Sequence, residues 1–214
     1  MPIDWATGLN AEVETTAEAM ACPMPRVKLI EPGTETGELK ELYDESRSMW
    51  GSVPRYLQML ANAPAAVQGW DLLDRRLRLD HLPEESEYVQ LQELIIVKTS
   101  IVNRCNYCTG HNVELGLTLG LTKEQMDDVA GDGWKTSPRF SHKQKTVIRW
   151  AEAVTRMTAH DDEETFQALR SYFDDRQIVE LTMIAAMWNL SNRVAEALHL
   201  VVEPPGQRIE FQTV

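Results

Sequence analysis

Apolar residues recur at intervals of three and four along most of the chain, which is the period of an amphipathic α-helix. The segments with this spacing are, in chain order, residues 37–50, 64–79, 83–102, 121–131, 147–157, 166–173 and 178–198. Pro54 and Pro64 stand where helices are expected to begin, since proline suits the first helical turn. No stretch alternates apolar and polar residues convincingly. The pattern therefore predicts an all-α fold.

Segment 83–102 differs from the others because apolar residues occupy more than one of its faces. Leu91, Leu94 and Ile95 keep the helical spacing, while Ile96 and Val97 fill the opposite side. We expect this helix to be buried nearly all round. In segment 64–79, the spacing predicts an inner face containing Val67, Trp70 or Asp71, Leu73 and Leu77. We expect the tryptophans to be core or subunit-contact residues rather than a ligand-binding set, namely Trp50, Trp70, Trp134, Trp150 and Trp188.

Local signals indicate where the later helices begin and end. Thr122 and Gln125 have the spacing of a capping box, and Gly131 follows as a stop. "GDGWKTSPRFSH", residues 131–142, reads as a loop. Pro204 and Pro205 are expected to stop the last helix. These limits divide the chain into an N-terminal arm (1–36), one helical domain (37–203) and a C-terminal tail (204–214).

Composition narrows the class of protein. The 214 residues suit one compact domain, and 43% hydrophobic with 25% charged residues is ordinary for a globular protein. The formal charge of −12 and the lack of a basic cluster argue against a nucleic-acid partner. No signal-peptide pattern and no run of about 18 apolar residues is present, so a cytoplasmic location away from the membrane is predicted.

Two of the three cysteines lie within "NRCNYCTGHN", residues 103–112. Cys105 and Cys108 share a helix face near a helix start, where the positive end of the helix dipole favours a thiolate. His111 follows three residues later. In a reducing compartment such a pair points to redox chemistry or to a metal. The alternatives are inert buried thiols and a zinc site; for zinc, His111 supplies only a third ligand. Cys22, in the arm, is interpreted as a bystander thiol.

A turn near Asn103 would place a carboxylate opposite this pair. If Asn103 caps the second helix, Glu93 lies about 15 Å before the turn and His111 about 12 Å after it, so the two stand nearly opposite in a hairpin. Glu93 is then expected to hold the imidazole, and His111 to take a thiol proton. The thiolate could attack a peroxide oxygen, and the other cysteine would resolve the sulfenic acid as a disulfide.

The sequence resembles the AhpD-like, carboxymuconolactone decarboxylase family. The likeness lies in Glu93, in "CNYC" twelve residues later with the histidine that follows it, and in the stretches "GSVPRYLQMLANAPAAVQGW" and "NRVAEALHL". The likeness spans roughly residues 40–200. It implies an all-helical bundle with an N-terminal extension, a homo-oligomer, and a thiol peroxidase or disulfide reductase site. Cys108 would be the peroxidatic thiol, Cys105 the resolving thiol, and Glu93 with His111 the proton relay. A lipoyl-type carrier or partner reductase would supply electrons, without a bound cofactor or metal.

One position departs from the family pattern. The usual histidine comes four residues after the second cysteine, whereas here His111 comes at three and Asn112 stands at four. That displacement turns the imidazole by about 100° around the helix axis.

From the cysteine pair and the family resemblance we hypothesise a cytoplasmic oxidoreductase that reduces hydroperoxides. The alternatives are a decarboxylase of the same fold, which would not depend on the cysteines, and a non-catalytic redox-sensing oligomer.

Overall fold

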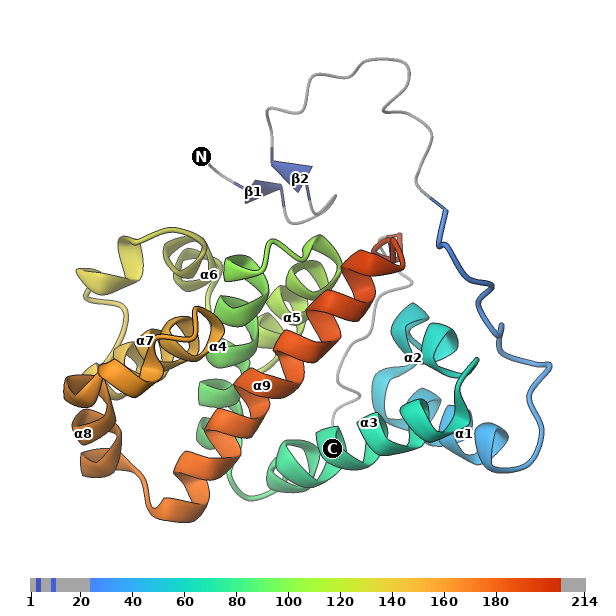
Figure 1. Cartoon of the computed structure of the whole chain (residues 1–214), viewed down its shortest axis with the longest axis horizontal. Coiled ribbons are helices and arrows are strands. Elements are labelled where there is room, and N and C mark those ends of the chain that lie inside the picture. Colours follow the sequence, from blue (N-terminus) through green and yellow to red (C-terminus); the bar gives the residue numbers. More distant parts are fainter. Residues whose placement is uncertain (1–2, 5–8, 11–23, 205–214) are drawn as a thin grey trace.

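A computed structural model describes residues 3–4, 9–10 and 24–204 of the chain. Within these residues the fold is helical apart from one two-residue strand pair, and α9 runs diagonally across the helices α4 and α5 (Figure 1). The elements are β1 (Ile3–Asp4), β2 (Leu9–Asn10), α1 (Glu38–Trp50), α2 (Arg55–Leu60), α3 (Pro64–Leu77), α4 (Ser86–Val102), α5 (Asn106–Thr118), α6 (Lys123–Ala130), α7 (His142–Thr155), α8 (Glu163–Tyr172) and α9 (Asp175–Ala197), with short 3-10 turns at Leu79–His81, Gly133–Lys135 and Ala159–Asp161.

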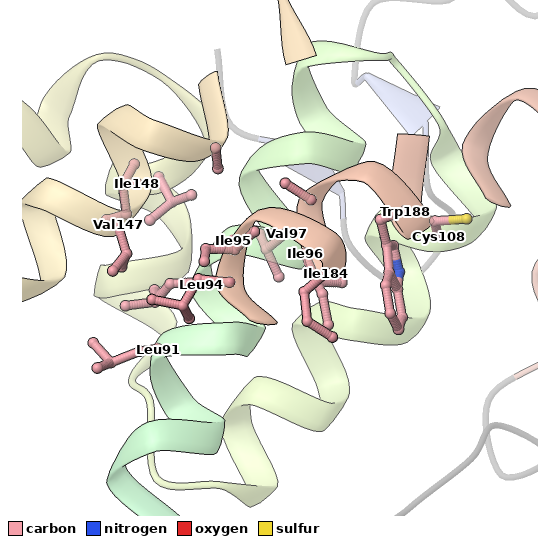
Figure 2. Close-up of a cluster of buried hydrophobic side chains, with 14 of the residues drawn as sticks. Leu91, Leu94, Ile95, Ile96, Val97, Cys108, Val147, Ile148, Ile184 and Trp188 are labelled. Atoms are coloured by element: carbon pink, nitrogen blue, oxygen red, sulfur yellow. The ribbon is translucent and has the colours of Figure 1, made fainter. Parts of the chain in front are cut away.

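Helix α4 lies at the centre of the molecule. Every residue from Leu91 to Ser100 is buried, as its unbroken apolar run predicts. α5, α7 and α9 pack around it, so none of its faces is left for solvent. Figure 2 shows the resulting core, in which Leu94, Ile95 and Val97 of α4 lie among side chains of α7 and α9. The helix that carries Glu93 is thus held on all sides by apolar packing, which favours a fixed position for any polar group on it.

Capping boxes begin three helices in the described part of the chain. Thr122 and Gln125 form the predicted capping box at α6. The same reciprocal arrangement begins α7 through Ser141 and Gln144. It also begins α9 through Asp174 and Gln177. Each box satisfies two backbone N–H groups that have no partner within the helix. The loop predicted between α6 and α7 is present, with a 3-10 turn in it.

The first three helices form a second apolar cluster beside the main core. It contains Leu42, Tyr43, Val53, Leu57, Ala61 and Val67. Pro54 caps α2 and Pro64 opens α3, as expected. The predicted inner face of α3 was wrong at Leu73, which is 42% exposed, because Asp74 is buried in its place. The spacing of apolar residues does not reveal that Asp74 is buried, because Asp74 is charged.

Two expected helix limits also differ from the structure. The last helix ends at Ala197, well before Pro204, and His199 then takes the left-handed backbone conformation with φ 53°. Asn103 is the C-cap of α4 and does not cap the next helix. The predicted arm 1–36 includes β1 and β2, which pair antiparallel, and its residues 24–36 are irregular. Cys22 lies outside the described residues.

None of the helices among the described residues combines the length and apolarity needed to cross a membrane.

Candidate functional site

The turn between α4 and α5 positions the cysteine pair. Arg104 takes a left-handed conformation with φ 57°, and this reverses the chain after the C-cap Asn103. The N–H of Cys105 then donates to the carbonyl of Ser100 at 2.9 Å. Cys105 is the N-cap of α5, because its Sγ accepts the N–H of Cys108 at 3.4 Å. A sulfur atom therefore occupies the place that Ser, Thr or Asp takes at most helix starts.

The two cysteines differ in their surroundings although both are buried. They are free thiols, with Cys105 fully buried and Cys108 4% exposed. The pKa of the Cys105 thiol is raised well above its ordinary value by a hydrogen bond to the Cys108 side chain, by burial and by the nearby Cys108 charge. Cys105 thus retains its proton and can donate it to the neighbouring sulfur.

His111 meets a carboxylate from the end of the described chain. Its Nε2 contacts Oε2 of Glu203, and both side chains are buried. The same carboxylate accepts the backbone N–H of Arg55 at 2.6 Å and the hydroxyl of Tyr107 at 3.3 Å. The rings of Tyr107 and His111 lie 4.6 Å apart between centroids. His111 is therefore held on one side by an aromatic ring and at Nε2 by a charge.

Glu93 has a different partner from the one expected. Its Oε2 accepts Nη1 of Arg78 at 2.9 Å, and Arg78 also pairs through Nε with Asp74 at 3.1 Å. Burial raises the pKa of Glu93 to about 7; the Arg78 charge opposes this shift, and the Asp74 charge adds to it. Burial likewise raises the pKa of Asp74. One guanidinium thus serves two buried carboxyls.

The expected approach of Glu93 to His111 fails for a reason of helix geometry. Glu93 lies against Gly116, where an added Cβ would be 3.5 Å from its Cγ. Gly116 is four residues after Asn112 and shares its face of α5, whereas His111 is rotated away by about 100°. Asn112, which stands at the usual histidine position, donates its Nδ2–H to the carbonyl of Cys108 at 2.7 Å. The hairpin is present as predicted, but the histidine faces Glu203.

A cavity of about 60 Å³ reaches Cys108 and His111. Arg78 and Asp74 line it as well, and Arg78 lies between the rings of Trp50 and Trp188, at 5.7 and 5.0 Å from their centroids. Figure 2 shows Cys108 and Trp188 at one edge of the main core. The other aromatic side chains of its wall are Tyr56, Trp70 and Tyr107. The cavity wall therefore combines aromatic side chains with one thiol, one imidazole, the buried Asp74–Arg78 ion pair and a second carboxyl, that of Asp71.

Several of these residues have a role that the sequence pattern does not indicate. Trp50, Trp70 and Trp188 were expected in the core or at subunit contacts, yet they also line the cavity. Arg78 and Glu203 carried no sequence signal, because their partners lie 15 and 92 residues away in the chain. Glu93 lies on an apolar helix, so a buried cationic partner could be expected for it. Arg78 is one of several basic residues in the sequence that could be this partner. In the described part of the chain, no three His, Cys, Asp or Glu side chains are grouped to hold a metal ion.

Comparison with known proteins agrees with this architecture. Residues 89–153, which include most of α4, the cysteine pair and His111, match the carboxymuconolactone decarboxylase family. The likeness to this family is shown for that segment, which is less than half of the chain. The uncharacterized protein YnjA of Escherichia coli (strain K12) is 22% identical over 152 residues, which cover 71% of this chain and 75% of YnjA.

Two solved structures share the family fold. An uncharacterized peroxidase-related protein of Ralstonia eutropha JMP134, described as an alkylhydroperoxidase AhpD core, superposes with a TM-score of 0.71 over 86% of this chain and 94% of its own, at 22% identity. The debrominase Bmp8 superposes with a TM-score of 0.67 over 82% and 91%, at 17% identity. At these identities the likeness establishes the AhpD-like helical fold and no more.

Proposed function

We propose that this protein is a thiol-dependent peroxidase that reduces organic hydroperoxides through a Cys105/Cys108 dithiol–disulfide cycle. The observation that carries the proposal is the asymmetry of the pair. Cys108 lines the cavity with His111, whereas Cys105 is fully buried and placed with its sulfur against the Cys108 N–H. One thiol is thus reachable by a substrate, and the other is poised to react with the first.

The first half of the cycle follows from these positions. His111 takes the Cys108 proton, and the thiolate attacks one oxygen of the hydroperoxide. An S–O bond forms, the O–O bond breaks, and the leaving alkoxide takes the proton held by His111 and departs as an alcohol. Cys108 is left as a sulfenic acid, oxidised by two electrons. Glu93 takes no part in this step, since its carboxyl bonds to Arg78.

Cys105 completes the oxidation. Its sulfur attacks that of Cys108, the S–O bond breaks, and the hydroxyl of the sulfenic acid leaves as water after taking the Cys105 proton. The resulting disulfide is restored by an external dithiol, which is itself oxidised to a disulfide. We propose a lipoyl-type carrier or a partner reductase as this donor. Subunits in a homo-oligomer would each carry one complete site.

Mass spectrometry of the reduced protein tests the proposal. The protein is treated with a slight excess of an alkyl hydroperoxide, and intact and peptide masses are measured for the wild type and for Cys105→Ser, Cys108→Ser and Cys22→Ser. We expect a loss of two hydrogens that maps to Cys105 and Cys108, and a sulfenic acid on Cys108 in Cys105→Ser. Cys22→Ser is the matched control and should behave as wild type.

Other outcomes identify the alternatives. Thiols that stay unchanged would refute the peroxidase and turn attention to a cysteine-independent decarboxylase. One equivalent of peroxide consumed per subunit, followed by no turnover with a dithiol present, would indicate a redox sensor. Continued turnover with dihydrolipoamide as the dithiol is the expected result.

A further inference from the structure

We propose that Glu203 is a positioning residue that holds His111 in one tautomer, with the proton on Nε2 and Nδ1 left as the base of the site. The catalytic meaning of this assignment rests on the proposed function, in which His111 accepts the Cys108 proton. The assignment of the tautomer does not rest on the proposed function, because it follows from contacts within the resting protein.

The contacts of Glu203 are those of a placed carboxylate. The residue belongs to the segment 199–203 that follows α9, and its side chain is buried. It accepts the Arg55 N–H at 2.6 Å and the Tyr107 hydroxyl at 3.3 Å, in addition to contacting Nε2 of His111. The Tyr107 hydroxyl is fixed in turn, because it accepts the N–H of Tyr56 at 3.0 Å. Groups from α2 and α5, two separate parts of the chain, therefore orient this carboxylate toward the imidazole.

Packing holds the segment itself against α5. Gly110 leaves room for Val202, since a Cβ on Gly110 would come 3.1 Å from Cγ2 of Val202. Arg55 also donates from Nη1 to the carbonyl of Val201 at 3.1 Å. The segment is thus attached one turn of α5 from the cysteine pair. Its position next to His111 is a property of the fold and does not require a bound ligand.

The chemistry of the pair sets the tautomer. A carboxylate has no proton to donate when ionised, so Nε2 must carry the hydrogen that it accepts. Burial alone would raise the pKa of Glu203, but its hydrogen bonds from His111 and from the Arg55 N–H lower that pKa overall. Glu203 is therefore ionised near neutral pH. Nδ1 of His111 is buried and has no hydrogen-bond partner among the described residues, so its lone pair remains available.

His111 lines the cavity that contains Cys108, so a proton acceptor on this ring is placed in the same space as the thiol. Other charged or titratable groups around it are Tyr107 on α5, Arg55 at the start of α2, and the Asp74 and Arg78 pair across the cavity. Arg78 is already paired with two carboxyls. Glu203 is the carboxylate whose removal would change the tautomer.

Nitrogen-15 NMR of the imidazoles tests the assignment directly. Spectra are compared for the wild type, Glu203→Gln, Glu203→Asp and Val202→Ala, with the His111 signals identified by their absence in His111→Gln. We expect Nε2–H in the wild type and in Glu203→Asp, which keeps the charge. In Glu203→Gln the amide N–H competes to donate to Nε2, so the population should move toward Nδ1–H.

The rate of Cys108 oxidation by an alkyl hydroperoxide is measured on the same proteins. In Glu203→Gln the oxidation rate is expected to be about 10–100-fold lower than in the wild type, the size of effect found when a carboxylate hydrogen-bonded to a metal-bound histidine is lost. Glu203→Asp is expected to recover the rate. Val202→Ala loosens the segment while leaving the carboxylate, and should keep the wild-type tautomer. A wild-type ring protonated on Nδ1, or a tautomer and rate unaffected by Glu203→Gln, would overturn the inference. If no protein reacts with peroxide, the proposed function fails, and the tautomer shift still decides the role of Glu203.

Discussion

Glu93 and Arg78 illustrate how a buried charge is tolerated at the scale of single residues. Arg78 is 2% exposed and offers its guanidinium to Glu93 and Asp74 while lying between two indole rings. Three ionisable groups in an apolar surrounding cannot all be charged without cost when two are negative. The raised pKa of both carboxyls expresses this competition. At neutral pH the cluster is expected to bind a proton that the unfolded chain would release.

This cluster makes a prediction for stability against pH. The pKa of Glu93 is raised to about 7 in the folded protein, from an ordinary value of 4.5. Its contribution is therefore fully present below pH 4.5 and is lost as the pH rises through 7. Glu93→Gln keeps the shape but cannot ionise. The free energy of unfolding of Glu93→Gln minus that of the wild type should increase between pH 5 and pH 8, by at most about 3 kcal/mol at about 1.4 kcal/mol per pKa unit.

Urea titrations at several pH values measure that difference. Glu87→Gln is the matched control, because Glu87 is an exposed carboxyl near the start of the same helix. A difference for Glu93→Gln that stays constant or decreases with pH would contradict the assignment of a raised pKa.

At the scale of elements, the site depends on two close approaches to α5. Gly116 lets the Leu121 side chain approach α5, since an added Cβ would come 3.3 Å from Leu121 Cδ1, and Gly110 lets the segment 199–203 approach α5 at Val202. Glycine within a helix destabilises the helix by about 1 kcal/mol relative to alanine. At each of these two positions the helix is therefore less stable, while a neighbouring side chain can pack closer to it. Helix periodicity does not reveal either position, because glycine carries no hydrophobic signal.

Gly110→Ala tests the second approach. Alanine should stabilise α5, but its Cβ presses on Val202, and the two effects oppose each other. In a Val202→Ala background the contact is removed, so Gly110→Ala should then stabilise by about 1 kcal/mol. Denaturant unfolding of the two single variants, the double variant and the wild type gives the coupling energy, which we expect to lie between about 0.5 and 3 kcal/mol. Additive effects would show that the two residues do not press on each other.

At the scale of the whole molecule, the cavity lies where the two apolar clusters meet. Leu60 and Trp70 pack against both the main core and the cluster of the first three helices. Trp70 also donates from Nε1 to Oγ of Ser191 on α9 at 2.8 Å, and its ring lies 5.1 Å from that of Tyr56. The site is thus assembled from α1, α2, α3, α5, α9 and the segment after α9, which approach one another only in the folded chain (Figure 1).

This junction predicts cooperative unfolding of both clusters. Hydrogen exchange followed by mass spectrometry should give similar protection for peptides from residues 42–67 and 91–115, since one cluster opens only with the other. Trp70→Ala removes the shared ring and should lower the protection of 42–67 more than that of 91–115. Trp134→Ala, which alters the main core away from the junction, is expected to lower both together. Unequal protection of the two regions in the wild type would contradict the coupling, and equal losses in Trp70→Ala would show that this ring does not carry it.

The sequence by itself determined the helices, the capping box at Thr122, the burial of α4 and the cysteine pair at a helix start. These features are local, because helical periodicity and caps act over a few residues. Only the tertiary structure decided that Glu203 meets His111, that Arg78 meets Glu93 and that three tryptophans line the cavity. Such contacts join residues far apart in the chain. They depend on the rotation of each helix about its axis, and a change of one residue in spacing turns a side chain by about 100°.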